Sequence, residues 1–141
     1  VEGFTPANSY EGELEIQTGD EALAAAGVKS VALIKMDIEG YEKFALMGLR
    51  RTLLRDRPIV EFELTANPNS PVSIKGAQEL AGLFPENYNF LIFSEGTNRM
   101  TGAYVLKPIE AALRFDALAQ YDLVAYPTEI AGRFPFKSTR R

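Results

Sequence analysis

The chain has 141 residues, of which 46% are apolar, so it is long enough for one domain with a hydrophobic core. It contains no cysteine and no histidine, which excludes disulfides, thiolate nucleophiles and the commonest general base. Four of the 15 basic residues fall in the last nine, so residues 1–132 carry 11 basic residues against 19 acidic ones. This acidic body argues against nucleic acid as a partner, and we expect one α/β domain over 1–132 with a basic tail over 133–141.

The first predicted elements are a short strand and a short helix. Leu14 and Ile16 alternate with polar residues over 13–17, which is typical of a strand. Thr18 and Glu21 have the spacing of a capping box, so we expect a helix that starts there and ends at Gly27.

The remaining pattern alternates between strands and helices. The predicted order is strand 31–38, helix 41–56, strand 59–64, helix 74–84, strands 88–93 and 103–106, helix 109–118 and strand 121–126. A strand, a helix and a second strand in succession predict a βαβ unit with two parallel neighbours. Gly48 lies inside the first of these helices, and we attribute it to close packing against a strand.

Five charged residues mark the carboxyl ends of the two predicted parallel strands. Lys35, Asp37 and Glu39 alternate along one strand and therefore point to one side, while Glu61 and Glu63 share a side of the next. If the two polar sides coincide, the acids need a cation, a basic group, water or a raised pKa to offset them. Open α/β sheets bind ligands at this edge, so an active-site crevice is the leading hypothesis. A solvated strand end with ordinary surface acids is the alternative.

Three segments together resemble a known family. They are IKMDIEGYE over 34–42, LMGL over 46–49 and RPIVEFEL over 57–64. FkbM-type methyltransferases carry a similar lysine–aspartate–glutamate–glycine strand end, a similar helix and a similar proline-led strand, and the resemblance covers roughly residues 14–127. It implies the later half of a class I, Rossmann-like methyltransferase sheet, mostly parallel with a C-terminal antiparallel strand. It also implies transfer of a methyl group from S-adenosylmethionine to a hydroxyl oxygen of a sugar, glycan or polyketide.

The resemblance also implies roles for individual residues. Asp37 and Glu39 would lie where the cofactor sulfur meets the acceptor hydroxyl, and Glu63 would occupy the neighbouring strand end. A carboxylate there could accept the hydroxyl proton or orient the acceptor. Lys35 and Glu61 would lie deeper and could form a structural ion pair.

The cofactor-binding elements of such a fold do not appear in this sequence. A complete domain starts with a glycine-containing loop after a strand, and its next strand ends in an acid that holds the ribose. Neither pattern is present, so we expect no tight binding of S-adenosylmethionine by this chain alone. Two alternatives are a Mg²⁺-dependent hydrolase or phosphotransfer enzyme, and a non-catalytic fragment.

Expectations about partners and location follow from the same features. A small-molecule or glycan acceptor is the expected ligand. The apolar edge of strand 31–38 predicts a homodimer, or cover of that edge by residues 1–17. No run of 18 apolar residues and no signal-peptide pattern occurs, which predicts a cytoplasmic protein without a membrane span.

Overall fold

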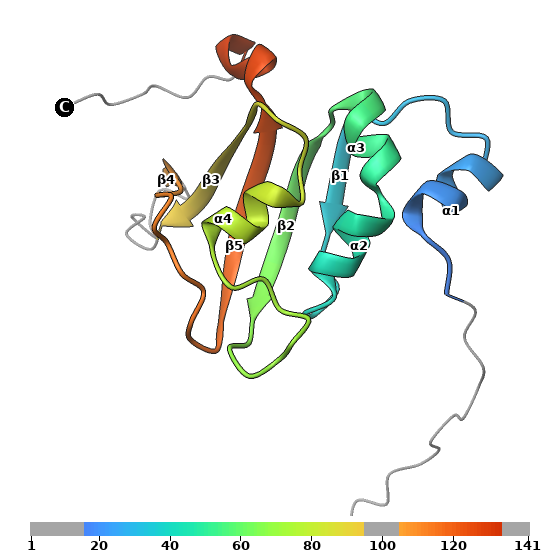
Figure 1. The fold of residues 1–141 in the computed structure, drawn as a ribbon. Helices are drawn as coiled ribbons and strands as arrows, with labels where there is room; N and C mark the ends of the chain where they lie inside the picture. Colours follow the sequence, from blue (N-terminus) through green and yellow to red (C-terminus); the bar gives the residue numbers. More distant parts are fainter. Residues whose placement is uncertain (1–15, 95–104, 134–141) are drawn as a thin grey trace, which may run out of the picture.

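The fold is a five-stranded sheet with helices packed against it, seen in a computed structural model that describes residues 16–94 and 105–133 (Figure 1). The strands lie in the spatial order β1-β2-β5-β3-β4. Their bounds are β1 Leu33–Met36, β2 Ile59–Ala66, β3 Tyr88–Ser94, β4 Val105–Pro108 and β5 Ala119–Pro127. The predicted mixture of strands and helices is confirmed.

The orientation of the strands differs from the expected mostly parallel sheet. The predicted β1–β2 pair is parallel, but the other three neighbouring pairs are antiparallel. Two of these pairs arise because β5 lies between β2 and β3 and runs against both, and the third joins β3 to β4, the next strand along the chain. The last strand is therefore antiparallel, as predicted, and it leaves only one parallel neighbouring pair in the sheet.

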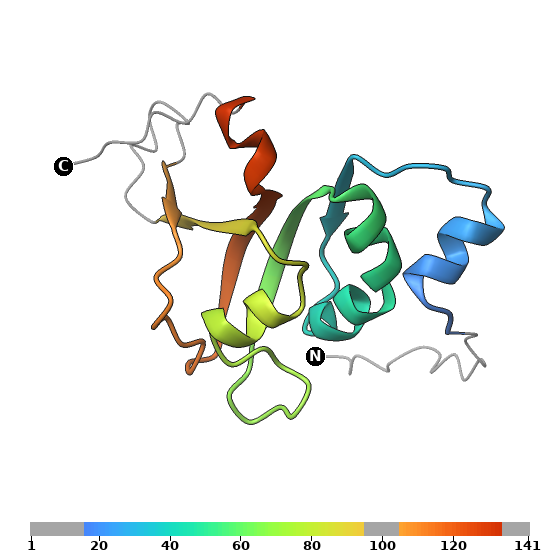
Figure 2. The same cartoon turned by 45° about the horizontal axis from the view of Figure 1, so that its top comes forward.

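Short helices cover one face of this sheet. Figures 1 and 2 show α2, α3 and α4 on the same side of the strands, with α1 beyond the β1 edge. The helices are α1 Gly19–Ala25, α2 Glu42–Gly48, α3 Arg50–Asp56, α4 Ala77–Gly82 and the 3₁₀ helix η1 Thr128–Arg133. The main core lies between these layers, where Leu46, Leu53 and Leu80 pack with Phe62 and Leu123. Within the described ranges, no helix has the length and apolar character needed to cross a membrane.

The capping box predicted at Thr18 starts α1 as expected. The Glu21 amide donates to the Thr18 hydroxyl at 3.3 Å, and the Thr18 amide donates back to the Glu21 carboxylate at 3.0 Å. The strand predicted over 13–17 lies largely outside the described residues. Its last two positions, 16 and 17, are described and belong to no strand.

The predicted helix over 41–56 is divided into α2 and α3 at Leu49. The Asp20 carboxylate explains the division, because it accepts hydrogen bonds from the Arg51 and Thr52 amides at 2.8 and 2.9 Å. It also accepts a bond from the Thr52 hydroxyl at 2.6 Å. A side chain of α1 therefore caps the first turn of α3. Because Asp20 accepts the bonds of these amides, they do not need the carbonyl groups that a preceding helical turn would supply.

The junction of these helices also explains two glycines. A Cβ on Gly19 would lie 2.6 Å from a methyl carbon of Leu49, and one on Gly48 would lie 3.4 Å from the Gly19 amide nitrogen. Gly48 therefore permits close packing of α2 against the start of α1, and our prediction that it packs against a strand is wrong.

The helix predicted over 109–118 is also wrong, because this segment is an irregular connection. Its backbone bonds to the segment around the start of α4: the Phe115 amide donates to the Lys75 carbonyl, and the Ala77 amide donates to the Leu113 carbonyl, both at 2.9 Å. Phe115 is fully buried and its ring centroid lies 5.0 Å from that of Tyr121. The segment thus buries the Phe115 ring and satisfies its backbone groups through bonds to the segment near α4, in place of the hydrogen bonds of a helix.

Candidate functional site: an acidic cluster at the ends of β1 and β2

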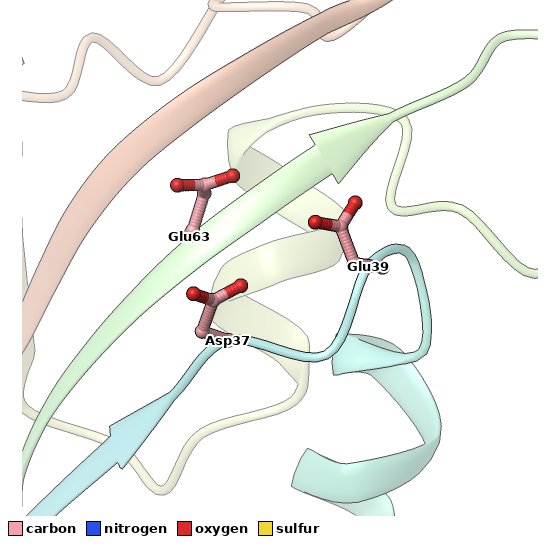
Figure 3. A group of neighbouring side chains, drawn as sticks. All are labelled: Asp37, Glu39 and Glu63. Carbon is pink, nitrogen blue, oxygen red and sulfur yellow. The ribbon is translucent and has the colours of Figure 1, made fainter.

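Three carboxylates gather where the two parallel strands end. Asp37 and Glu39 follow β1, whereas Glu63 lies on β2, and their side chains project from the same side of the ribbon (Figure 3). One oxygen from each lies within 4.8 Å of the others. The predicted coincidence of the two polar strand sides is therefore confirmed. It follows from the parallel register, in which Met36 is opposite Phe62 one residue before this point.

A tight turn directs Glu39 toward the other two acids. Glu39 and Gly40 have φ angles of 53° and 98°, so two successive residues adopt left-handed or related conformations. Glycine adopts such angles without steric cost, whereas a residue with a Cβ rarely does. The Gly40 amide donates to the Glu42 carboxylate at 2.8 Å, and Glu42 is 1% exposed. Glu42 therefore holds the turn that positions Glu39.

We did not assign a role to Glu42 from the sequence. The sequence did contain an indication of this role, because an acid near the start of a helix can accept a hydrogen bond from a backbone amide that has no partner within the helix. What the sequence did not indicate was its burial, which follows from the contact of α2 with the sheet.

Lys35 neutralises Glu61 but none of the three acids of the cluster. Its ammonium donates to the Glu61 carboxylate at 2.7 Å, and the two residues are direct partners in the β1–β2 register. The hydrogen bond to Glu61 raises the pKa of Lys35. Both side chains are exposed, so the predicted ion pair exists but does not lie deeper in the fold. Among the described residues, no cation forms an ion pair with Asp37, Glu39 or Glu63.

Burial and neighbouring negative charge act together on Glu63. Loss of solvent raises the pKa of its carboxyl, and the negative charges of Asp37, Asp122 and other nearby acids raise it further. Asp122 lies on β5 directly opposite Glu63 in the antiparallel register. It was absent from the predicted site, because sequence alone did not indicate that β5 would be the neighbour of β2.

The cluster has the donor atoms for two kinds of chemistry. Carboxylate oxygens are the ligands that Mg²⁺ and Ca²⁺ prefer, and three within 4.8 Å can converge on one cation. A carboxylate with a raised pKa beside other acids is also suited to accept a proton from a hydroxyl group. Exposed acids also cluster in proteins where they bind no ligand. The distances within the cluster are therefore compatible with both metal binding and proton transfer.

The described residues do not form a cradle for S-adenosylmethionine. Gly40 is the one glycine in the described ranges that lies within five residues after a strand, apart from Gly132 beyond β5. Its amide is already bonded to Glu42 and is not free for a ligand. Among the described residues, the turn after β1 therefore offers no free glycine amide to a cofactor.

Comparison with known proteins assigns the family. A family model described as the methyltransferase FkbM domain matches residues 10–93, more than half of the chain. The chain belongs to the FkbM methyltransferase family. No curated protein and no solved structure gave a match.

The match places the acidic cluster inside the FkbM domain. Residues 10–93 include β1, β2 and the turn between β1 and α2, so Asp37, Glu39 and Glu63 all belong to the matched region. The resemblance deduced from the sequence is thereby confirmed at the level of the family. Asp122 lies beyond the matched region, on the strand that the fold places next to β2.

Proposed function

We propose that this chain is part of an S-adenosylmethionine-dependent O-methyltransferase, and that its sheet is the later half of a Rossmann-like class I domain. The observation that carries the proposal is the convergence of Asp37, Glu39 and Glu63 within the FkbM-matched region. Two of these acids follow one parallel strand and the third lies on its neighbour, which is the edge where open α/β sheets bind substrates.

The proposed chemistry divides the work between the cofactor and this chain. When bound, S-adenosylmethionine supplies an electrophilic methyl group. The residues of this chain accept the hydroxyl proton of the acceptor, whose oxygen takes that methyl group, and the cofactor would leave as S-adenosylhomocysteine once its carbon–sulfur bond is broken. Glu63 is a suitable proton acceptor, because its raised pKa makes its carboxylate more basic than that of an ordinary glutamate. Asp37 and Glu39 accept hydrogen bonds that orient the hydroxyl group.

The exposure of the cluster favours a hydroxyl-rich acceptor. Asp37 and Glu39 are exposed, and Glu63 is partly exposed. Carboxylates on an open surface can accept hydrogen bonds from several neighbouring hydroxyl groups of a sugar or glycan. We therefore propose a sugar, glycan or polyketide hydroxyl as the acceptor, and the cytoplasmic location stays a prediction.

The test is transfer of a labelled methyl group from S-adenosylmethionine to a panel of sugars and polyketide alcohols. This chain is assayed alone and fused after the glycine-loop half of another FkbM domain. We expect transfer by the fusion and none by the chain alone. A fusion that binds the cofactor but labels only amines, thiols or carbon atoms would contradict the proposed oxygen acceptor.

A second candidate function rests on the distances within the cluster. Three carboxylate oxygens within 4.8 Å could hold Mg²⁺ for a hydrolase or a phosphotransfer enzyme. Titration with MgCl₂ decides between the two. A Mg²⁺-dependent rise in Tm that disappears in Glu63→Gln, with release of phosphate from phosphate esters, would favour this function over methyl transfer.

A further inference from the structure

The loop that follows β2, residues 67–73, is closed around one ammonium group. The Lys75 ammonium donates to the carbonyl oxygens of Asn67 and Pro68 at 3.1 and 3.2 Å. It also donates to the carbonyl oxygen of Ser70. An ammonium group has three protons, so these carbonyls can accept all of them. The β2 loop is therefore folded around a charged centre.

A carboxylate joins this lysine to α2. The Glu79 carboxylate accepts a hydrogen bond from the Lys43 ammonium at 2.6 Å and one from the Lys75 amide at 2.8 Å. Glu79 lies on α4 and Lys43 on α2, so the carboxylate bridges two helices. The hydrogen bond from Lys43 and that from Lys75 lower the pKa of Glu79. The carboxylate is therefore ionised at neutral pH and keeps both partners.

The first turn of α2 also holds the turn that carries Glu39. Lys43 directly follows Glu42, whose buried carboxylate accepts a hydrogen bond from the Gly40 amide at 2.8 Å. One helical turn thus contacts both the acidic site and the Glu79 bridge. Figures 1 and 2 both show the β2 loop beside the turn that joins β1 to α2. Both segments lie at the carboxyl edge of the parallel strands, where open α/β sheets bind ligands.

We propose that Glu79 is a positioning residue that fixes the β2 loop and the turn of Glu39 relative to each other, as two walls of the acceptor site. Glu79 acts through Lys43 and Lys75 rather than on the acceptor itself. The role toward an acceptor rests on the proposed function, whereas the coupling of the two segments does not. The loop also complements the acids, because the exposed Asn69 amide can donate hydrogen bonds to sugar oxygens and ionised carboxylates only accept them.

Hydrogen exchange in the 141-residue chain tests the coupling. Glu79→Gln keeps the size of the side chain but removes the charge that holds both partners. The Asn67 amide, which donates to the Ser73 hydroxyl at 2.9 Å, should exchange roughly 10-fold faster in this variant. The Gly40 amide should accelerate as well, although its own acceptor is Glu42. An unchanged rate at Gly40 would overturn the proposal.

Two controls separate coupling from a general loss of stability. The Leu53 amide, which donates to the Leu49 carbonyl at 2.8 Å, should keep its rate in Glu79→Gln. Equal acceleration there would show a purely structural effect and overturn the proposal. Glu61→Gln is the matched variant, because Glu61 also pairs with a lysine of a neighbouring element, Lys35, at 2.7 Å. If it accelerates the same amides as Glu79→Gln, the proposal is wrong.

Lys43→Met tests whether the bridge acts as one unit. It should accelerate the Gly40 amide as much as Glu79→Gln does, because either change breaks the contact between α2 and α4. The double variant should then be no faster than either single one, since interacting residues are not additive. Additive acceleration in the double variant would contradict the coupling through Glu79.

Kinetics of the fusion with a glycine-loop half test the link to the acceptor. A loosened wall weakens binding of the ground state and the transition state alike. Glu79→Gln should therefore raise KM for a sugar acceptor about 10-fold, with kcat and cofactor affinity nearly unchanged, and Glu61→Gln should alter none of these. A fall in kcat at constant KM would overturn the positioning role. If the unmodified fusion methylates no oxygen, the proposed function fails, while the exchange rates decide the coupling on their own.

Discussion

Glu63 of β2 and Asp122 of β5 are direct partners in the antiparallel register, so two carboxylates face each other on one side of the sheet. Like charges directly opposite each other on neighbouring strands are destabilising. Asp122 is one of the negative charges that raise the pKa of Glu63, after the loss of solvent and the charge of Asp37. With Asp122, the group of acids therefore extends from the end of β1 across β2 to the antiparallel strand β5.

Glu63→Gln is expected to raise Tm at pH 7. The folded-state pKa of Glu63 is raised, so its ionised form is less favourable in the folded chain than in the unfolded one. Below the ordinary pKa the carboxyl is neutral in both states, and the advantage of the variant should vanish. Thermal melting at pH 7 and at about pH 3.5 measures this difference. A higher Tm for the variant at both pH values would contradict the electrostatic cause.

Asp37→Asn should impair catalysis in a form of the protein that binds S-adenosylmethionine. The substitution keeps the shape but removes the charged oxygen that orients the acceptor hydroxyl, so kcat should fall by roughly 10²-fold or more. Tm should stay constant or rise, because one like charge leaves the cluster. Near-full kcat in this variant would show that the acid is only part of the scaffold.

Glu61→Gln is the matched control for that variant. Glu61 is paired with Lys35 at 2.7 Å, and both side chains are exposed, so solvent screens the pair and it contributes little to stability. We expect activity to be largely kept and Tm to change little. Equal loss of kcat in both variants would show that the total negative charge at this edge of the sheet, rather than Asp37 itself, causes the effect.

The chain alone should not bind S-adenosylmethionine tightly. Its described residues lack a glycine cradle with free amides, because the Gly40 amide is bonded to Glu42. Isothermal titration calorimetry of the 141-residue chain should give no binding heat at micromolar cofactor concentrations. Micromolar affinity would show that another part of this chain holds the cofactor.

Asp20→Ala should lower the free energy of unfolding by about 1–2 kcal/mol, the usual cost of losing a helix cap. It removes the acceptor of two α3 amides and leaves the hydroxyl of the buried Thr52 without that bond. Burial alone would raise the pKa of Asp20, but these hydrogen bonds outweigh it and lower the pKa. The stabilisation is therefore present above the ordinary pKa and is lost as the pH falls through the lowered value.

Urea unfolding at neutral and acid pH measures the effect of Asp20→Ala. Arg51→Ala is the control, because it removes an exposed side chain 3.5 Å from the Asp20 carboxylate but keeps the backbone amide. It should cost no more than about 0.5 kcal/mol. If both variants lose the same stability, the ion pair rather than the cap joins α1 to α3.

Gly19→Ala should destabilise the chain, whereas Gly82→Ala should not. A Cβ on Gly19 would lie 2.6 Å from a side-chain carbon of Leu49, so either the Leu49 side chain must move or the contact of α1 with the α2–α3 junction must open. We expect a loss of about 1–3 kcal/mol, typical of overpacking. Gly82 ends α4, and a Cβ there meets nothing within 4 Å, so alanine should be neutral or stabilise by up to about 1 kcal/mol. Chemical denaturation of both variants compares these effects.

Features that depend on neighbours in the chain could be predicted from the sequence. The Thr18–Glu21 capping box closes within one turn, so its residues reveal it without the fold. Asp37 and Glu63 directly follow Met36 and Phe62, which are partners in the parallel register, so that register is sufficient to bring the two acids together. The position of Glu39 depends in addition on the turn at Gly40. The family resemblance likewise rests on contiguous motifs within the matched region.

Features that depend on distant segments were decided by the tertiary structure. Asp20 lies 31 residues before Arg51, and the cap that divides the predicted helix exists only because α1 packs against α3. The insertion of β5 beside β2 brings Asp122 opposite Glu63, although 58 residues separate them in the chain. A hydrogen bond or a like-charge contact requires the two groups to be a few ångströms apart. Local sequence specifies the groups and the local conformation, and only the path of the whole chain specifies that distance.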